Sequence, residues 1–264
     1  MLKVVAILIL TAFPVVASTS NRVVIRDSVA PSHREELTQR LRAITGWSEL
    51  AFADDGALQI AATNVMANVE KGSRSARDLL TRAVEGPRMI LFEDASSRKD
   101  VVFCRVVPGK FVGELPADVD VYLVLIDFDD FRQVSGDRQA RAAFDVGWAV
   151  LHEIDHVVED SQDPTTDTSL GECEAHINEM RRELGLPTRN SYFFSFIPIK
   201  NDPNFMSRFV RLGFDHIGTP AKKKRYWLIW DAAIVGGLET PDLISSTRHQ
   251  AIVPPSSSPR GSGQ

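Results

Sequence analysis

Residues 137–159 read DRQARAAFDVGWAVLHEIDHVVE, and this stretch decides the fold because its apolar residues recur with the period of a helix. An apolar side chain returns to the same face every three or four positions, and further apolar residues widen that face. Such a composition is typical of a helix buried inside a domain. We therefore expect one buried helix over residues 137–159. Its main apolar stripe comprises Ala140, Phe144, Trp148 and Leu151.

The same helix carries the pattern H-E-x-x-H, formed by His152, Glu153 and His156. Residues four apart on a helix lie on one face about a turn apart, so both imidazoles can bind one cation. This motif is typical of zinc hydrolases, in which the glutamate acts as general base. The sequence therefore predicts one catalytic Zn²⁺ bound by His152 and His156, with Glu153 as the base.

A catalytic zinc ion takes three protein ligands and keeps its fourth position for water, so a third donor is expected downstream. A second helix is predicted over residues 169–184, with Gly185 and then Pro187 ending it. This helix contains two acidic candidates for the third ligand, Glu172 and Glu174.

In this region the chain resembles the gluzincin branch of zinc metallopeptidases. In that group a helix that follows the H-E-x-x-H helix supplies a ligand glutamate, often with a small residue three positions later and a polar residue four later. Glu172 matches this pattern with Ala175 and His176, so the resemblance implies Glu172 as the third ligand. Glu174 is the alternative, with Asn178 four positions later.

A structural role for Glu172 is also open, because Ser169 and Glu172 form an S-x-x-E pattern that can cap a helix start. Under the metallopeptidase interpretation, His176 would hydrogen-bond a zinc-bound carboxylate or imidazole. Asn178, Arg189 and Tyr192 are further candidates for supporting the site or an oxyanion. Tyr192 also fits core packing with a hydrogen-bonded hydroxyl.

The stretches 178–181 and 185–192 look like the region after the third-ligand helix in some metallopeptidase-like domains of bacterial secreted and toxin proteins. The whole resemblance covers about residues 145–192. It implies a peptide or protein substrate and says nothing of the remaining chain.

The N-terminus has the layout of a signal peptide: Lys3, an uncharged apolar run, and small residues at a cleavage point after Ala17. We therefore expect residues 1–17 to be removed and the mature chain to be periplasmic or extracellular, without a membrane span. An oxidising compartment would allow Cys104 and Cys173 to pair, although two separate buried thiols are an equal alternative. A formal net charge of −5 argues against nucleic acid as a partner.

The remaining pattern predicts an α+β fold. Helices are expected over residues 32–44 and 73–84, and strands over 88–92, 101–107, 119–128, 208–214 and 226–235. The run Val121–Asp127 is continuously apolar up to Ile126, which favours a central strand over a sheet edge. Residues 245–264 are expected to form a disordered tail.

Together these features predict a single zincin-like domain over residues 18–244, with a small twisted sheet, an active-site helix and a third-ligand helix. Its parts would be an N-terminal helix and sheet part (18–136), the active-site helices (137–185) and a β-containing C-terminal part (186–244). The expected function is a secreted zinc metallopeptidase. The alternatives are an exported non-catalytic zinc-binding or partner-binding module and a zinc hydrolase that cleaves a non-peptide amide or ester.

Overall fold

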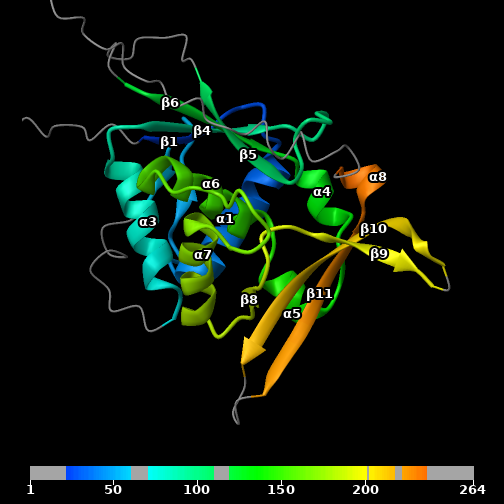
Figure 1. Ribbon diagram of the computed structural model, residues 1–264. Helices are drawn as coiled ribbons and strands as arrows, with labels where there is room; N and C mark the ends of the chain where they lie inside the picture. Colours follow the sequence, from blue (N-terminus) through cyan, green and yellow to red (C-terminus); the bar gives the residue numbers. More distant parts are fainter. Residues whose placement is uncertain (1–21, 61–70, 110–118, 201, 218–221, 237–264) are drawn as a thin grey trace, which may run out of the picture.

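The computed structural model describes residues 22–60, 71–109, 119–200, 202–217 and 222–236. Within these ranges, helices and several sheets form a mixed α/β fold (Figure 1). The predicted signal peptide and the predicted tail lie outside the described residues. In the described part, no helix has the length and apolar character needed to cross a membrane.

The first sheet has four strands in the order β1-β4-β6-β5. The strands are β1 (Val23–Ile25), β4 (Met89–Asp94), β5 (Cys104–Gly109) and β6 (Val121–Ile126). β1, β4 and β6 run parallel, whereas β5 pairs antiparallel with β6 at the edge of the sheet. β6 therefore lies between two other strands, which confirms the central-strand interpretation of its apolar run and makes the edge alternative wrong.

Four helices pack against this sheet and one another: α1 (Pro31–Thr45), α3 (Arg74–Glu85), α6 (Val146–Glu159) and α7 (Glu172–Glu183). Figure 1 shows them gathered on one side of the sheet, with α6 in the middle of the group. α1 and α3 confirm the first two predicted helices. The shared core buries apolar residues from the sheet and from all four helices, as the periodicity of each helix requires.

The expected single helix over residues 137–159 is wrong in its first part. The chain forms α5 (Arg138–Ala142), breaks at residues 143–145, and begins again as α6. The break has a local cause, because the Asp145 carboxylate accepts hydrogen bonds from the backbone nitrogens of Gly147 and Trp148. Asp145 therefore caps a new helix instead of continuing the old one.

The C-terminal part builds a second sheet in the order β7-β11-β10-β8, with β9 also paired to β10. Its main strands are β10 (Asp202–Ile217) and β11 (Lys223–Asp231), which run antiparallel and confirm β structure in both predicted C-terminal segments. The shorter strands are β7 (Ser135–Gly136), β8 (Thr188–Arg189) and β9 (Ser195–Ile199).

The strand predicted over 226–235 ends earlier than expected. The Asp231 side chain accepts from the backbone nitrogen of Ala233 and starts the short helix α8 (Ala232–Val235). The other short elements are β2 (Ala51–Phe52), β3 (Leu58–Gln59) and α4 (Phe128–Arg132).

Candidate metal centre

α6 presents His152 and His156 on one face, as the four-residue spacing predicts. Their ring centroids are 4.8 Å apart and the rings are nearly perpendicular. Each side chain keeps 12% of its surface exposed, so the pair lies at the border of the core and can be reached from solvent.

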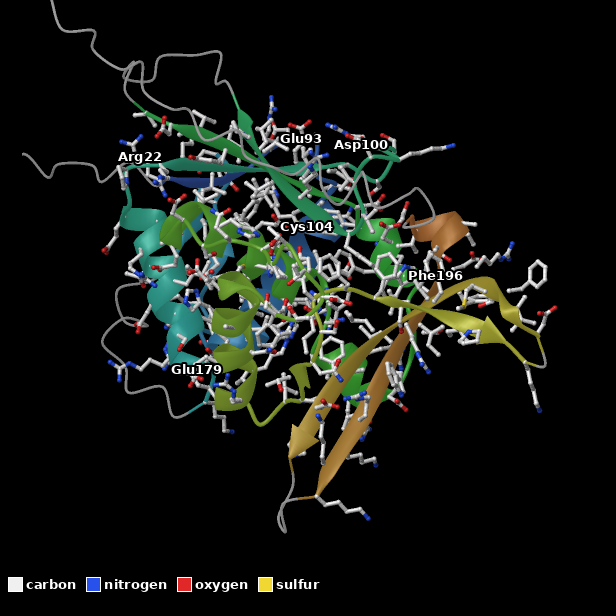
Figure 2. The ribbon with its side chains drawn as sticks, viewed as in Figure 1. Arg22, Glu93, Asp100, Cys104, Glu179 and Phe196 are labelled. Carbon is white, nitrogen blue, oxygen red and sulfur yellow. The ribbon has the colours of Figure 1, made fainter. Side chains whose placement is uncertain are left out.

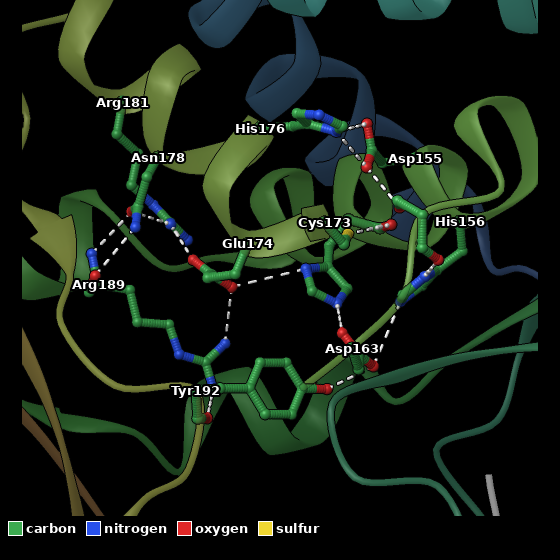
Figure 3. A network of polar contacts seen from close by, with 12 residues as sticks. Asp155, His156, Asp163, Cys173, Glu174, His176, Asn178, Arg181, Arg189 and Tyr192 are labelled. Atoms are coloured by element: carbon green, nitrogen blue, oxygen red, sulfur yellow. Dashed lines mark hydrogen bonds and ion pairs between the residues drawn. The ribbon is translucent and has the colours of Figure 1, made fainter. Parts of the chain in front are cut away.

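The loop after α6 brings an acidic residue to this pair. Asp160 adopts a left-handed backbone conformation (φ 55°) that ends α6 and turns the chain back. Asp163 then places its Oδ1 3.2 Å from Nε2 of His152 and its Oδ2 3.4 Å from Nε2 of His156. The two Nε2 atoms therefore converge on one carboxylate (Figure 3).

A hydrogen-bonded chain holds the loop in this position. Nδ1 of His156 donates to the carbonyl oxygen of Ser161 at 2.8 Å, because a carbonyl oxygen can only accept. The Ser161 hydroxyl donates to the buried Asp155 carboxylate at 2.7 Å, and Nδ1 of His176 lies 3.0 Å from the same carboxylate. Because His156 donates its Nδ1 proton to the Ser161 carbonyl oxygen, a neutral His156 carries its free lone pair on Nε2. That nitrogen is the one that a metal would bind.

A buried ion cluster supports the other imidazole. Glu174 is 1% exposed, and its two carboxylate oxygens contact the guanidinium groups of Arg181 and Arg189. The same carboxylate lies 3.6 Å from Nδ1 of His152, opposite the nitrogen that faces the loop. Asn178 joins the cluster through Arg181 and the backbone of Arg189. Glu174 therefore orients His152 from behind.

The structure overturns the preference for Glu172 as third ligand. Glu172 is the exposed first residue of α7 and takes no part in the metal-ligand cluster of the described residues. It also forms no capping box, because Gly171 occupies the N-cap position and no side chain caps α7. Glu174, the alternative, faces the His152 imidazole but is bound to two arginines, so Asp163 is the acidic side chain that both Nε2 atoms meet.

The expected position of His176 is also wrong. His176 is half exposed and contacts Asp155 instead of an imidazole or a ligand carboxylate. Its contribution to the site is indirect, through the carboxylate that holds Ser161.

Tyr192 contacts both Asp163 and His152. Its hydroxyl donates to Oδ2 of Asp163 at 2.6 Å, and its ring stacks at 6.1 Å from the ring of His152. The guanidinium carbon of Arg189 lies 4.8 Å from the centroid of the Tyr192 ring. Tyr192 thus restrains both the acidic side chain and one imidazole.

Glu153 is buried on the sheet side of α6. Its Oε2 accepts a hydrogen bond from the backbone nitrogen of Val106, on the edge strand β5, at 2.9 Å. Burial raises the pKa of Glu153, while the positive charge of His152 and His156 opposes that rise. The strand therefore holds Oε2 of Glu153, whereas Oε1 accepts no hydrogen bond from the part of the chain that the structure describes.

The charges of the cluster depend on one another. Burial lowers the pKa of His156, but the hydrogen bond that His156 donates to Asp163 and the charges of Glu153 and Asp163 outweigh it and raise the pKa to about 9. Burial alone would raise the pKa of Asp163, yet hydrogen bonds and charge from both histidines hold it well below its usual range. The site thus favours positive charge beside an ionised carboxylate.

The two cysteines are free thiols in the structure, which agrees with the alternative of two separate thiols and not with a bond between Cys104 and Cys173. Cys173 is buried in α7, and its sulfur belongs to the same cluster as His152, His156 and Asp163, whose ligand atoms lie within 4.8 Å of one another. Its thiol donates to the carbonyl oxygen of His152 at 3.2 Å, and burial raises its pKa. Cys173 therefore lies among the candidate ligand atoms, with its thiol directed at a backbone carbonyl oxygen.

The donor set fits a zinc ion on distances. Zn–N and Zn–O bonds of about 2.0–2.2 Å at a tetrahedral angle separate two ligand atoms by about 3.3–3.5 Å. In the structure, Nε2 of His152 lies 3.2 Å from Oδ1 of Asp163 and Nε2 of His156 lies 3.4 Å from Oδ2, close to that separation but to different oxygens of one carboxylate. Catalytic zinc sites commonly use two imidazole nitrogens and one carboxylate as ligands. The second nitrogen of each imidazole usually has a polar partner, as His152 has in Glu174 and His156 in Ser161.

Asp163, Ser161 and Asp155 were not among the residues that the sequence pattern singled out. A signal for Asp163 did exist, because it lies in the short connection directly after the H-E-x-x-H helix, where a chain reversal returns it to the histidines. The third donor was instead expected on the helix that follows this loop.

Comparison with known proteins adds no relative: no family model matches the chain, and no curated protein or solved structure matches it.

Proposed function

We propose that this chain is a zinc-dependent hydrolase, in the first place a metallopeptidase, in which His152, His156 and Asp163 bind the metal and Glu153 is the general base. The observation that carries the proposal is the convergence of two Nε2 atoms on one carboxylate at ligand-to-ligand separations that suit zinc. A sheet before α6, a supporting helix after it and a β-containing C-terminal part further support a zincin-like fold.

When bound, the zinc ion would polarise the scissile carbonyl and lower the pKa of water at its open position. Glu153 would take a proton from the attacking water and give it to the leaving group, using the oxygen that Val106 leaves free. Burial favours the protonated form of Glu153, which suits the second of these two transfers.

Tyr192 is the best-placed electrophile, because its hydroxyl already lies at the ligand carboxylate. A hydroxyl at this position would donate either to Asp163 or to an oxyanion that develops beside it. Arg189 is less suited to the oxyanion, because its guanidinium group is bound by Glu174 and by the backbone oxygens of Ser191 and Tyr192.

One observation favours the non-peptide amide or ester as a second candidate substrate. An extended peptide would pair with the outer edge of β5, because the inner edge is bound to β6. On that outer edge the N–H of Val106 is donated to Glu153, and Pro108, two residues on, has no N–H. β5 therefore offers a peptide mainly carbonyl acceptors.

The test measures zinc content and hydrolysis on the same samples. Wild type and Glu153→Gln should each bind one zinc, whereas His156→Ala and Asp163→Ala should lose it. Glu172→Gln is the matched control, because its side chain is exposed on α7, and it should behave as wild type. Only wild type and the control should cleave a peptide library.

The outcomes separate the candidate functions. Zinc without cleavage of peptides, but with cleavage of small amides or esters, would select the second substrate class. Zinc without any hydrolysis would select a non-catalytic metal-binding module. Zinc retained by Asp163→Ala and lost by Glu172→Gln would refute the ligand set.

A further inference from the structure

The β9–β10 hairpin, defined here as residues 195–199 and 202–211, carries most of the exposed apolar surface. It projects from the body of the molecule, and Phe196 is labelled at its base in Figure 2. Seven large apolar side chains of the described residues are at least 36% exposed, and five of them lie on this hairpin. These five are Phe196, Ile199, Phe205, Met206 and Phe209. A soluble protein rarely gathers so many in one place without a use for them.

The exposed side chains occupy both faces of the hairpin near its tip. Pro198 and Met206 are register partners, so their side chains share one face. Ile199 follows Pro198 directly in β9 and therefore points to the opposite face. Met206 is 57% exposed and Ile199 44% exposed. A protein surface docked on one face would leave the other in water, whereas a lipid phase would cover both.

The charges of the hairpin fit an anionic surface. The hairpin and its turn contain three basic residues and one acidic residue, in a chain whose formal net charge is −5. Lys200 is exposed beside the tip, and Arg208 is 62% exposed although its guanidinium group also contacts Asp231. Lysine and arginine can keep their charges at the headgroup level while their alkyl stems accompany apolar neighbours.

We propose that the tip of the β9–β10 hairpin inserts into a lipid surface that carries anionic headgroups. The apolar side chains enter the boundary between headgroups and acyl chains, and Lys200 and Arg208 contact the headgroups. Interfacial elements bury their apolar side chains about 5–10 Å deep, which corresponds to two or three residues of each strand. This inference goes beyond the proposed hydrolase and does not depend on the metal.

The experiment measures binding of the full chain to phosphatidylcholine vesicles with and without phosphatidylglycerol. Wild type should bind, and more tightly to the anionic vesicles. Phe205→Ser combined with Met206→Ser should lower the partition coefficient at least tenfold, equivalent to about 1.4 kcal/mol. Lys200→Glu should weaken binding to anionic vesicles only. Ile234→Ser is the matched control, because Ile234 is 62% exposed but lies on α8, and it should bind as wild type.

A second measurement keeps the test independent of folding defects. Tryptophan emission of Phe205→Trp should shift to the blue on vesicle binding and be quenched by brominated lipids. Absence of wild-type binding, or equal binding by the double variant, would overturn the proposal. Loss of self-association in the double variant, without any vesicle binding, would instead assign the hairpin to a contact between copies. His156→Ala should bind vesicles normally, so failure of the zinc proposal remains distinguishable.

Discussion

The carbonyl oxygen of Ser161 accepts the Nδ1 proton of His156 at 2.8 Å, and this bond couples the metal loop to the helix it follows. The Ser161 hydroxyl is in turn held by Asp155, one residue before His156. Asp155 lies on α6 but touches no candidate ligand atom in the contacts described. It therefore positions the site without binding the metal.

Replacing Asp155 by Asn should weaken zinc binding. The neutral side chain removes the charged acceptor shared by Ser161 and His176, so the loop that carries Asp163 loses its anchor. Loss of such outer contacts typically costs roughly 10–100-fold in metal affinity. Competition with a chelating dye would measure the affinity, and Glu172→Gln serves as the unaffected control. A zinc affinity within about twofold of wild type would show that the loop carrying Asp163 keeps its position without the Asp155 carboxylate.

Tyr192→Phe should also weaken zinc binding, by roughly tenfold, because it removes the hydroxyl that donates to Oδ2 of Asp163. The phenyl ring still stacks on His152, so the fold should be retained. If Tyr192 also stabilises an oxyanion, turnover at saturating zinc should fall roughly 10²–10³-fold. Unchanged turnover at saturating zinc would restrict Tyr192 to its contact with Asp163.

The sequence predicted the two histidines because their arrangement is local: a four-residue spacing on one helix places both imidazoles on one face. Asp163 could not be placed in the same way. Its position depends on the left-handed turn at Asp160 and on the hydrogen bond between Ser161 and Asp155. Neither feature follows from the periodicity of a helix, because both belong to the loop after it.

The error on α7 has a different cause. Cys173, Ile177 and Met180 recur with the helical period and are buried in the structure. Glu174 and Arg181 are seven residues apart, so they lie on the same buried face of α7, and their charges are opposite. Glu172 lies on the exposed face. A buried ion pair cannot be read from hydropathy, because charged residues count as surface in any apolar pattern.

Glu174→Gln should destabilise the fold strongly. The neutral amide leaves Arg181, whose side chain is 2% exposed, without its counter-charge. Breaking a buried pair in this way costs about 3–5 kcal/mol. Urea unfolding measures the change, and Glu179→Gln on the same helix is the control, because the Glu179–Arg182 pair is more than half exposed and should contribute under about 1 kcal/mol. Equal effects of the two substitutions would contradict the buried cluster.

Asp130→Asn should stabilise the protein in a pH-dependent manner. Burial, with the charges of Asp127 and Asp129, raises the pKa of Asp130 to about 7, although its hydrogen bond from the Phe103 backbone opposes the rise. The folded state therefore binds more protons than the unfolded state between about pH 4 and pH 7, and stability falls as the pH rises through that window.

The Asp130→Asn variant lacks this ionisation but can still accept the Phe103 N–H, so its stability should lie close to that of wild type at about pH 4. At about pH 8, where Asp130 is ionised and buried, the variant should be more stable by about 1–2 kcal/mol, a value reduced from the full shift for partial solvent screening. Urea unfolding at both pH values measures the difference. Asp129→Asn, at a side chain that is 63% exposed, should change stability much less at either pH. A gain for Asp130→Asn that is equal at the two pH values would rule out the raised pKa as its source, because a packing effect has no reason to follow the titration of the carboxyl.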